Sequence, residues 1–530
     1  MRESLAIIFA ILAIVVASRV RKFYSGVKAV SGLPGPPVLF LPVSFFGALV
    51  PTTWRHPGLS YHWIERFKAY KYFGSEVLAF VPFLCGPPAI YISNLDVAHQ
   101  VLAGGRSALT FKKTHGTKFI LGLWGQNISS SEGDAWRKHR RVLGPAFGNR
   151  MNSHVWSRTV HTYHDMVAAE RWGDRDSVEI PVAQAIIFKF TTLIIGHCGF
   201  GFTFDWASPA RLPDGSMSIQ DAIHLVVDPA LGHLVMSYPK WVHRLPFTKT
   251  LRNVRKAHEG LTRFMHEQVA DRKAALSGFL DGSAELSEDV LSRLIVANEA
   301  ESGKLKLADD EVVGNVFALL LAGYESTGYS IAAALGCISL HKDIQDEASK
   351  QIEAVVGLNR DPDIDDFPQL TKVLGIFFEA VRMFPGGHMV LREAGEDTTI
   401  TVPNPAGEAG SRTIPILKGT RLVVDMIGIQ HNPRYFDEPE KFKPSRWDGI
   451  SSDSEAFTAF SFGPRTCLGR KFAIVEAVCW LTMVLRDWWV EPLLRPGETE
   501  EMWRQRSLDA RAGMTLYVSD VPVRLVRRSV

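Results

Sequence analysis

The segment Phe460-Ser-Phe-Gly463-Pro-Arg465-Thr-Cys467-Leu-Gly469 decides how the rest of the sequence is interpreted. It places a single cysteine in a loop rich in glycine and proline, directly before a pattern typical of a helix. Backbone amides at the start of a helix favour the thiolate form of a cysteine. The glycines allow the backbone to approach a flat ligand closely, and Arg465 supplies a fixed positive charge. The combination indicates a ligand-binding thiol, although a lone buried cysteine is more often a small apolar side chain.

The composition of the chain is that of a globular protein. Of its 530 residues, 46% are hydrophobic and 22% are charged, which argues against disorder. A net charge of +3 without a block of like charges argues against a nucleic-acid partner. The five cysteines are scattered and odd in number, which fits a reducing compartment rather than a disulfide framework. The sequence contains no P-loop and no complete dinucleotide-binding fingerprint, so we expect no flavin- or nicotinamide-binding domain.

The N-terminal region combines an apolar run with basic residues. Leu5–Ala17 is apolar throughout, and Arg19, Arg21 and Lys22 follow it. Its length is roughly 20 Å as a helix, short of a hydrocarbon core of about 30 Å. Charge after the run, with no clean cleavage site, favours a membrane anchor over the alternative of a cleaved signal peptide. We therefore predict an anchor over residues 1–24 and a basic, proline-rich hinge over residues 25–37.

The body of the chain is predicted to be mainly helical. Helical patterns dominate residues 60–350, whereas Thr398–Val402 and Arg421–Val424 are β-like. Asp309–Leu340 begins with acidic residues, which suit a helix start, and is apolar nearly all round, which predicts a helix through the interior. Its centre, Ala322-Gly-Tyr-Glu-Ser-Thr327, carries a glycine and a carboxylate. Both residue types cost stability at such a position, and such costs tend to mark function.

The cysteine segment matches the pattern Phe-x-x-Gly-x-Arg-x-Cys-x-Gly at every fixed position and resembles the haem-binding loop of cytochrome P450. The resemblance covers the chain from about Leu33 onwards. It is strongest to microsomal eukaryotic members, and the sequence of the cysteine loop is typical of fungal ones. It implies a mainly α fold with small β-sheets and one catalytic domain over residues 38–530, where length alone suggests about three domains. Three further motifs stand in the family's order: Trp136-x-x-x-Arg140, residues 322–327, and Glu379-x-x-Arg382 followed by Pro444-Ser-Arg446-Trp447.

The resemblance implies haem b as the cofactor, with Cys467 as the ligand of the iron. It also implies that Glu379, Arg382 and Arg446 form a buried structural network. His388 is left open between a propionate partner and a residue of the substrate pocket. The other implied cofactor-binding residues are Arg465, Trp136, Arg140, Arg392, Phe460, Gly463 and Gly469.

In the family the central helix motif carries an acid and an alcohol that relay protons during oxygen activation, while its glycine opens space over the iron. The implied catalytic residues are Glu325, Ser326 and Thr327. Ser326 stands where the family usually has threonine, and serine lacks the methyl group that restricts the hydroxyl. Thr327 is the alternative, although one residue along a helix points about 100° away.

The resemblance implies a monooxygenase that oxidises a lipophilic small molecule with O2, for example a terpenoid in secondary metabolism. Its implied partners are an NADPH-dependent flavoprotein reductase, with cytochrome b5 as a further donor, and membrane lipid. Its implied location is the endoplasmic reticulum membrane, with a single-pass anchor and a cytosolic catalytic domain. Three alternatives stay open: an O2-independent isomerase or dehydratase of the same family, a non-catalytic haem-binding membrane protein, and a cysteine hydrolase.

Overall fold

The computed structural model describes residues 2–42, 44, 47, 51–53, 57–103, 110–122, 124–202, 204–207, 211–227, 249–280, 287–451 and 457–528. The chain forms two compact units, each assembled from separate stretches of sequence. Unit 1 comprises Met1–Thr117, Gly387–Lys441 and Ser461–Arg465. Unit 2 comprises Lys118–Gly386, Phe442–Phe460 and Thr466–Val530.

Unit 1 is built around a mixed sheet with the strand order β2-β4-β10-β7-β5, in which only β4 and β10 run parallel. Side chains alternate between the two faces of the sheet, so each face has its own apolar cluster. The strands are β2 (Val77–Phe80), β4 (Ala89–Ile92), β5 (Phe111–Lys112), β7 (Met389–Ala394) and β10 (Arg421–Asp425).

Smaller elements complete unit 1. Two further pairs of strands form, one parallel and one an antiparallel hairpin: β1 (Val38–Phe40) with β3 (Pro82–Cys85), and β8 (Thr398–Pro403) with β9 (Ser411–Ile416). Its short helices are α3 (Tyr61–Glu65), α4 (Lys68–Phe73), α5 (Leu95–Leu102), α17 (Met426–Gln430) and the 3-10 turn η7 (Gly463–Arg465). Helix α6 (His115–Leu121) begins in unit 1 and ends at a residue of unit 2.

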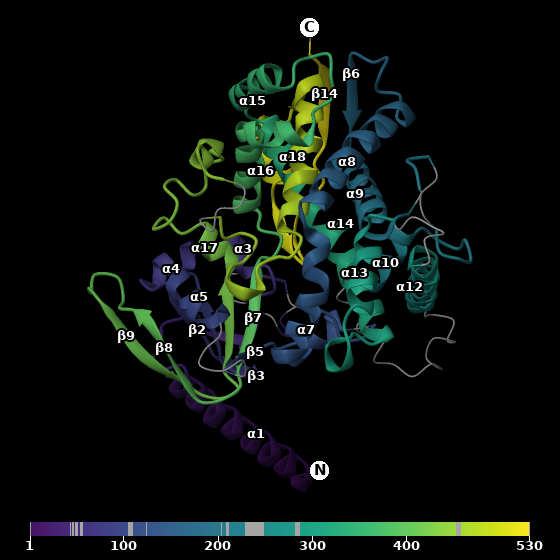
Figure 1. The fold of residues 1–530 in the computed structure, drawn as a ribbon. Coiled ribbons are helices and arrows are strands. Elements are labelled where there is room, and N and C mark those ends of the chain that lie inside the picture. The colour runs from purple at the N-terminus through teal and green to yellow at the C-terminus, as the bar shows by residue number, and fades with distance from the viewer. Residues whose placement is uncertain are drawn as a thin grey trace. The chain divides into compact units, whose positions relative to one another are not determined.

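The N-terminal helix α1 (Arg2–Ala29) contacts β3 near its end and otherwise leads away from the sheet of unit 1 (Figure 1). Apolar side chains such as Phe9 and Ile14 are 66% and 69% exposed. Among the described residues, no helix is long and apolar enough to cross a membrane. The proline-rich segment that follows is extended but docked, because the Ala79 amide donates to the Pro34 carbonyl over 2.8 Å.

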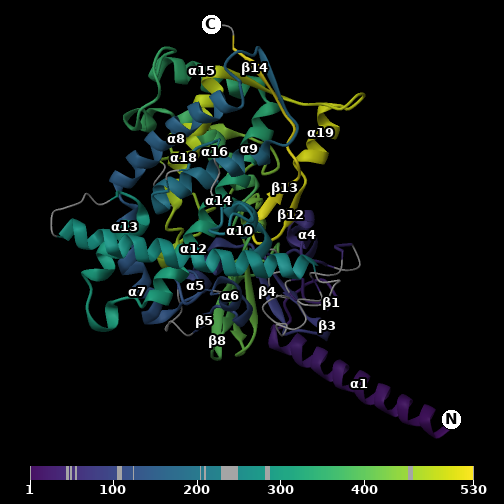
Figure 2. The same cartoon turned by 90° about the vertical axis from the view of Figure 1, so that its right-hand side faces the viewer.

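Unit 2 is mainly helical, as the sequence pattern predicts. Helix α12 lies across α10, α13 and α14 (Figure 2). Its longer helices are α7 (Gly133–Leu143), α8 (Asn149–Ala169), α9 (Ala183–Ile194), α10 (Ile219–Val227), α12 (Lys249–Leu280), α13 (Val290–Glu299), α14 (Asp309–Ser339), α15 (Lys342–Val355), α16 (Thr371–Met383), α18 (Arg470–Asp487) and α19 (Glu500–Ser507).

The remaining elements of unit 2 are short. An antiparallel sheet has the order β11-β14-β6, and a separate hairpin pairs β12 with β13. The strands are β6 (Ser177–Ile180), β11 (Trp488–Pro492), β12 (Ala510–Ala512), β13 (Leu516–Val518) and β14 (Val523–Arg527). The short helical turns are η1 (Gly144–Phe147), η2 (Ile195–Gly199), η4 (Gly303–Leu305), η5 (Ile364–Gln369) and η6 (Pro444–Trp447), of which η2 is a π-helix.

Helix α14 runs through the interior of unit 2, between α9, α12, α16 and α18 (Figures 1 and 2). Most of its side chains are buried, as its apolar sequence predicts. One stripe is different: Ala322 is exposed, and Leu319 and Ser326 are partly exposed. These positions are separated by three and four residues and therefore share one face of the helix. Two residues of the candidate motif, Ala322 and Ser326, thus lie on the open side of an otherwise buried helix.

Close packing between α9 and α14 depends on glycine. A Cβ atom at Gly328 would lie 2.3 Å from Cδ1 of Phe188. We expect Gly328→Ala to lower the free energy of unfolding by about 1–3 kcal/mol, because overpacking outweighs the roughly 1 kcal/mol gain in helix propensity. Gly116→Ala is the matched control, since nothing lies within 4 Å of that position in α6. Thermal unfolding of the two variants followed by circular dichroism tests this, and equal stability would contradict the packing argument.

Candidate functional site

The loop before α18 presents the thiol of Cys467. The Cys467 amide donates to the Phe460 carbonyl over 3.0 Å, and Gly469 is the N-cap of α18. Of the four cysteine side chains that the structure describes, Cys467 alone is exposed, whereas Cys198, Cys337 and Cys479 are buried. The loop therefore turns back on itself and leaves one thiol accessible next to the start of a helix.

Opposing effects act on the Cys467 thiol. The protein around it raises its pKa by desolvation, even though the side chain is accessible at its surface. The Gly469 amide and the charges of Arg140 and Arg470 act in the opposite direction and stabilise the thiolate. The net shift of the pKa is upward, because desolvation outweighs the Gly469 amide and the two positive charges.

Helix α7 carries the predicted pair Trp136 and Arg140. The two side chains are one turn apart, so they lie on the same face, and both are half-buried. The other Lys and Arg residues of this helix form ion pairs within the protein: Arg137 with Asp134, Lys138 with Glu311 and Arg141 with Glu301. Arg140 makes no ion pair with any residue that the structure describes, and its charge reaches Cys467. An anionic group could therefore pair with Arg140 beside the thiol.

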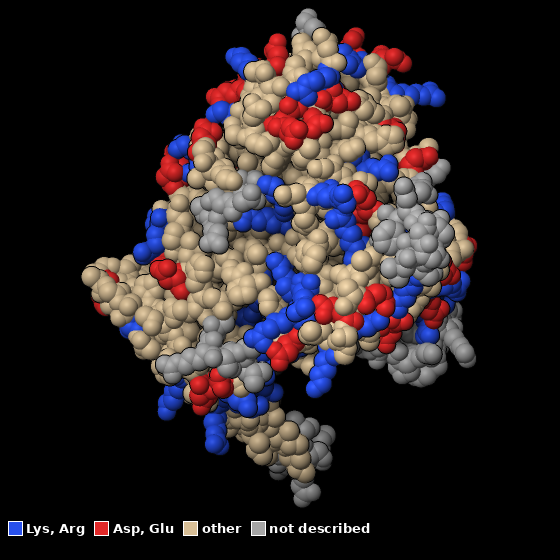
Figure 3. Space-filling view, viewed as in Figure 1, with Lys and Arg blue, Asp and Glu red and all other residues tan. Residues whose placement is uncertain are grey.

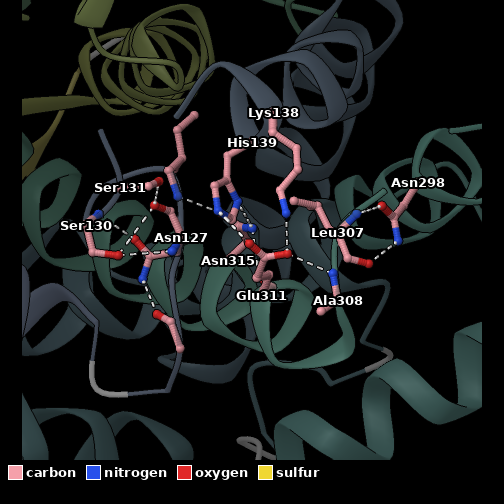
Figure 4. A network of polar contacts seen from close by, with 12 residues as sticks. Asn127, Ser130, Ser131, Lys138, His139, Asn298, Leu307, Ala308, Glu311 and Asn315 are labelled. Carbon is pink, nitrogen blue, oxygen red and sulfur yellow. Dashed lines mark hydrogen bonds and ion pairs between the residues drawn. The ribbon is translucent and has the colours of Figure 1, made fainter. Parts of the chain in front are cut away.

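A buried polar network fixes α7 against the first turns of α14 (Figure 4). Asn315 accepts a hydrogen bond from the Ile128 amide over 2.9 Å through its Oδ1. Its Nδ2 therefore donates, to Nδ1 of His139 over 2.8 Å and to the Glu311 carbonyl over 2.7 Å. His139 must accept at Nδ1 and carries its proton on Nε2, so the ring is neutral. Burial agrees with this, since it lowers the pKa of His139 to about 4.

The loop that leads into α7 is held by hydrogen bonds of Asn127. Oδ1 of Asn127 accepts from the amides of Ser129 and Ser130, each over 2.9 Å, and the Ser131 hydroxyl donates to the Asn127 carbonyl (Figure 4). This arrangement, together with Asn315 and His139, orients the helix that carries Trp136 and Arg140. Sequence reasoning did not identify Asn315 and His139, because their contact joins two elements far apart in the sequence, and it did not identify the local turn around Asn127.

The candidate acid and alcohol on α14 have their hydrogen-bond partners on two different elements. The Ser326 hydroxyl donates to the Ala322 carbonyl of the same helix over 2.7 Å. The carboxyl of Glu325 accepts from the Thr515 hydroxyl, in the turn of the β12–β13 hairpin, over 2.9 Å. Burial raises the pKa of Glu325, and the Thr515 hydrogen bond partly opposes this shift. Thr327 is only 3% exposed and faces the interior of unit 2.

Gly323 has a packing role in this structure. The family pattern implies that this glycine opens space over the iron. Here a Cβ atom at Gly323 would lie 2.7 Å from Cδ1 and Cγ1 of Ile195, the first residue of the π-helix η2. The missing side chain therefore allows η2 to approach α14 closely.

Glu379 lies at the centre of the predicted structural network, and its side chain is fully buried. Arg382 donates to both carboxylate oxygens over 2.9 Å, and Arg446 donates from Nε to Oε1 over 3.0 Å. The Lys443 amide and the Trp447 indole also donate to the carboxylate, each over 3.0 Å. Five donors thus compensate the buried charge, as a buried carboxylate requires.

An aromatic cluster joins this network to the cysteine loop. The ring of Trp447 lies 5.0 Å from that of Phe457, which in turn lies 5.7 Å from that of Phe460. Phe460 is the residue whose carbonyl accepts the Cys467 amide. The Glu379 network therefore supports the position of the thiol through packed rings.

The other predicted cofactor-binding residues belong to unit 1. Arg392 lies on β7, is buried, and donates to the Leu391 carbonyl over 2.9 Å. Gly463 has φ +74°, a conformation that favours glycine, and begins the turn that contains half-buried Arg465. His388 is buried and its Nδ1 lies 2.8 Å from Nε2 of His62.

Comparison with known proteins identifies the family. Residues 51–508 match the family described as Cytochrome P450, so the chain belongs to the cytochrome P450 family. It is 31% identical over 536 residues to "Cytochrome P450 monooxygenase 124" of Postia placenta, covering all of both chains. It is 23% identical to the "Phomenoic acid biosynthesis cluster cytochrome P450 monooxygenase" of Leptosphaeria maculans, covering 79% of this chain and 76% of that one.

A solved structure agrees in fold. The zebra fish cytochrome P450 with progesterone superposes with a TM-score of 0.67 at 19% identity, covering 88% of this chain and 99% of that chain. The predicted family and the mainly α fold with small sheets are therefore confirmed. Members of this family are oxidoreductases that bind haem through a cysteine thiolate, and its monooxygenases use O2, a redox partner and a lipophilic substrate.

The residues of unit 2 fit a haem group. An accessible thiol beside a helix start suits the iron, Arg140 lacks an anionic partner among the described residues, and Ala322 exposes one side of α14. The donor set is soft sulfur next to fixed positive charge, which suits a thiolate-ligated porphyrin with anionic propionates.

Breaking the buried carboxylate network should be costly. We expect Glu379→Gln to lower the free energy of unfolding by about 3 kcal/mol or more, because the two arginines would remain buried without their counter-charge. Glu501→Gln is the control, since it removes an exposed partner of Arg504 and should have little effect. Thermal unfolding and haem content of the purified variants are the measurements. A variant at position 379 as stable as the control would contradict the role of the network.

Proposed function

We propose that this protein is a haem-thiolate monooxygenase that inserts oxygen into a lipophilic small molecule, with electrons from an NADPH-dependent flavoprotein reductase. The observation that carries the proposal is the accessible thiol of Cys467 beside the start of α18 and the charge of Arg140. The bound haem supplies the redox chemistry, since it accepts the electrons and activates O2. The protein supplies the ligand, the proton path and the exclusion of water.

Cys467 is proposed as the iron ligand, and Trp136 and Arg140 as partners of a propionate. The ion pairs of the other basic residues of α7 leave Arg140 available for an anion, and Asn315 and His139 fix the helix rotation. Phe460 and Gly469 shape the loop around the thiol. In unit 1, Arg392, Gly463 and Arg465 stay predictions from the family motif.

Proton delivery is proposed for Glu325 and Ser326 rather than Thr327. Ser326 is partly exposed on the same stripe as Ala322, whereas Thr327 is buried. The Ser326 hydroxyl donates to the Ala322 carbonyl, which leaves its oxygen lone pairs available as acceptors. Burial raises the pKa of the Glu325 carboxyl, which favours the protonated form that a proton donor requires.

The reductase is proposed to dock on the basic surface of α7. Lys and Arg side chains, blue in Figure 3, gather where α7 lies in the view of Figure 1. Arg137 and Arg141 are 67% and 62% exposed. An acidic partner would be attracted to this surface, and the attraction would weaken as salt is added.

The exposed apolar side chains of α1 support a membrane-associated location. We propose that α1 embeds in the endoplasmic reticulum membrane and that the basic residues in its C-terminal part, Arg19, Arg21 and Lys22, keep the remaining chain in the cytosol. The substrate is proposed to be a secondary metabolite, because a fungal relative is named for a biosynthetic cluster.

Replacement of Cys467 tests the ligand. The reduced, CO-bound protein should show the absorbance typical of thiolate-ligated haem, and Cys467→Ala should lose it. Cys479→Ala is the control, because this buried thiol lies on α18, the helix that follows Cys467, and should retain the spectrum at some cost in stability. Retention of the thiolate spectrum in the first variant would refute the assignment.

The proton path is tested by the stoichiometry of NADPH and O2. With reductase and no added substrate, reduction of O2 to water uses two NADPH and reduction to peroxide uses one. Ser326→Ala should decrease the share of water about tenfold or more, because proton supply limits that branch. Thr327→Val should leave the ratio near that of the unmodified protein. The reverse pattern would assign the relay to Thr327.

A further inference from the structure

We propose that Thr515, in the turn of the β12–β13 hairpin, is a positioning residue that sets the orientation of the Glu325 carboxyl, so that this hairpin takes part in proton delivery. The inference rests on the proposed function of Glu325. The contact joins residues 190 positions apart in the sequence: the Thr515 hydroxyl donates to Oε1 of Glu325 over 2.9 Å.

The hairpin is held against α14 at neighbouring points. Thr515 and Tyr517 are two residues apart and project to one side, while Leu516 and Val518 are buried on the other. Glu325 and Tyr329 are one turn apart on α14, and the rings of Tyr329 and Tyr517 lie 5.5 Å apart. One side of the hairpin thus follows one face of the helix over a full turn.

Backbone hydrogen bonds hold the turn, one within it and one to Gly386. The Gly513 amide donates to the Thr515 carbonyl over 3.0 Å, and the Leu516 amide donates to the Gly386 carbonyl over 3.0 Å. A Cβ atom at Gly386 would lie 3.6 Å from Cβ of Ser326. The hairpin is therefore linked directly to Glu325 through Thr515, and to the neighbourhood of Ser326 through Gly386.

The acid and the alcohol are oriented independently of each other. Ser326 bonds to the backbone of its own helix, so its hydroxyl keeps its direction as long as α14 is intact. Glu325 bonds to the hairpin, so the direction of its carboxyl depends on Thr515. A shift of the hairpin would release the acid without disturbing the alcohol.

Among the described residues, a small set of titratable groups lies around Glu325. The titratable groups that interact with it or its neighbours are Tyr324 and Tyr329 on α14, and Tyr517 and Asp520 after the turn. Burial raises the pKa of Glu325, and the Thr515 hydroxyl opposes this by donating to the charged form. Loss of the donor should therefore raise the pKa further. In turnover the carboxyl gives up one proton and recovers one from water, so it is unchanged overall.

The test uses the full-length, haem-loaded protein in its ferric state. The carboxyl band of Glu325 is followed by infrared difference spectroscopy during a pH titration and is identified by its loss in Glu325→Gln. Thr515→Val, which keeps the shape and removes the donor, should shift the titration upward by about one pH unit. Thr515→Ser should restore the original midpoint. Thr413→Val, on β9 of unit 1, is the matched control and should cause no shift.

A second measurement follows the pH dependence of NADPH oxidation with reductase and no added substrate. Thr515→Val should shift this profile in the same direction as the infrared titration, and Thr515→Ser should not. If Thr515→Val fails to fold, Thr515→Ala replaces it with the same expectation. An unchanged midpoint in the donor-free variant, or a shift in Thr515→Ser as large as in Thr515→Val, would overturn the inference.

The two proposals fail in different ways. Absence of the thiolate spectrum in the unmodified, CO-bound protein would remove the proposed function. If the spectrum is normal but the titration midpoint of the Glu325 band is unchanged in Thr515→Val, only the role of the hairpin would be refuted.

Discussion

The buried carboxylate of Glu379 is the interaction on which much of unit 2 depends. A charge without access to water is stable only when donors surround it, and here two arginines, an indole and a backbone amide do so. Because these donors come from α16 and from residues 443–447, one carboxylate joins two stretches of chain far apart in sequence. The aromatic rings next to Trp447 then extend the support to the loop that carries Cys467.

Helix α14 shows how one element serves both packing and chemistry. Its glycines admit Phe188 and Ile195 of the α9–η2 segment on one side, and Ala322 leaves another side open. The hydroxyl of Thr191 also donates to the Tyr324 carbonyl over 3.0 Å, which adds a polar link between the two helices. One face of the motif is therefore packed tightly against the α9–η2 segment, and another face is accessible. Glu325 and Ser326 are both partly exposed.

Sequence reasoning reached the parts of the site that local spacing determines. The pair on α7, the acid and alcohol on α14 and the cysteine before α18 are each defined within a few residues, so a helical period or a loop pattern was enough to predict them as candidates. It did not find Asn315, His139 or Thr515, because their contacts join residues 176 to 190 positions apart. The structure also adds a packing role for Gly323, since η2 packs against it, and the sequence pattern did not predict this contact.

The direction of the Asn315 amide has a consequence for how the protein responds to acid. With its oxygen committed to the Ile128 amide, Asn315 can only donate to His139, and a protonated imidazole would leave two donors facing each other. His139 therefore stays uncharged until the pH falls to about 4. The hydrogen bonds that join α7 to α14 therefore persist from neutral pH down to about pH 4. Mild acidification leaves the orientation of Trp136 and Arg140 unchanged, because no proton enters the contact that fixes their helix.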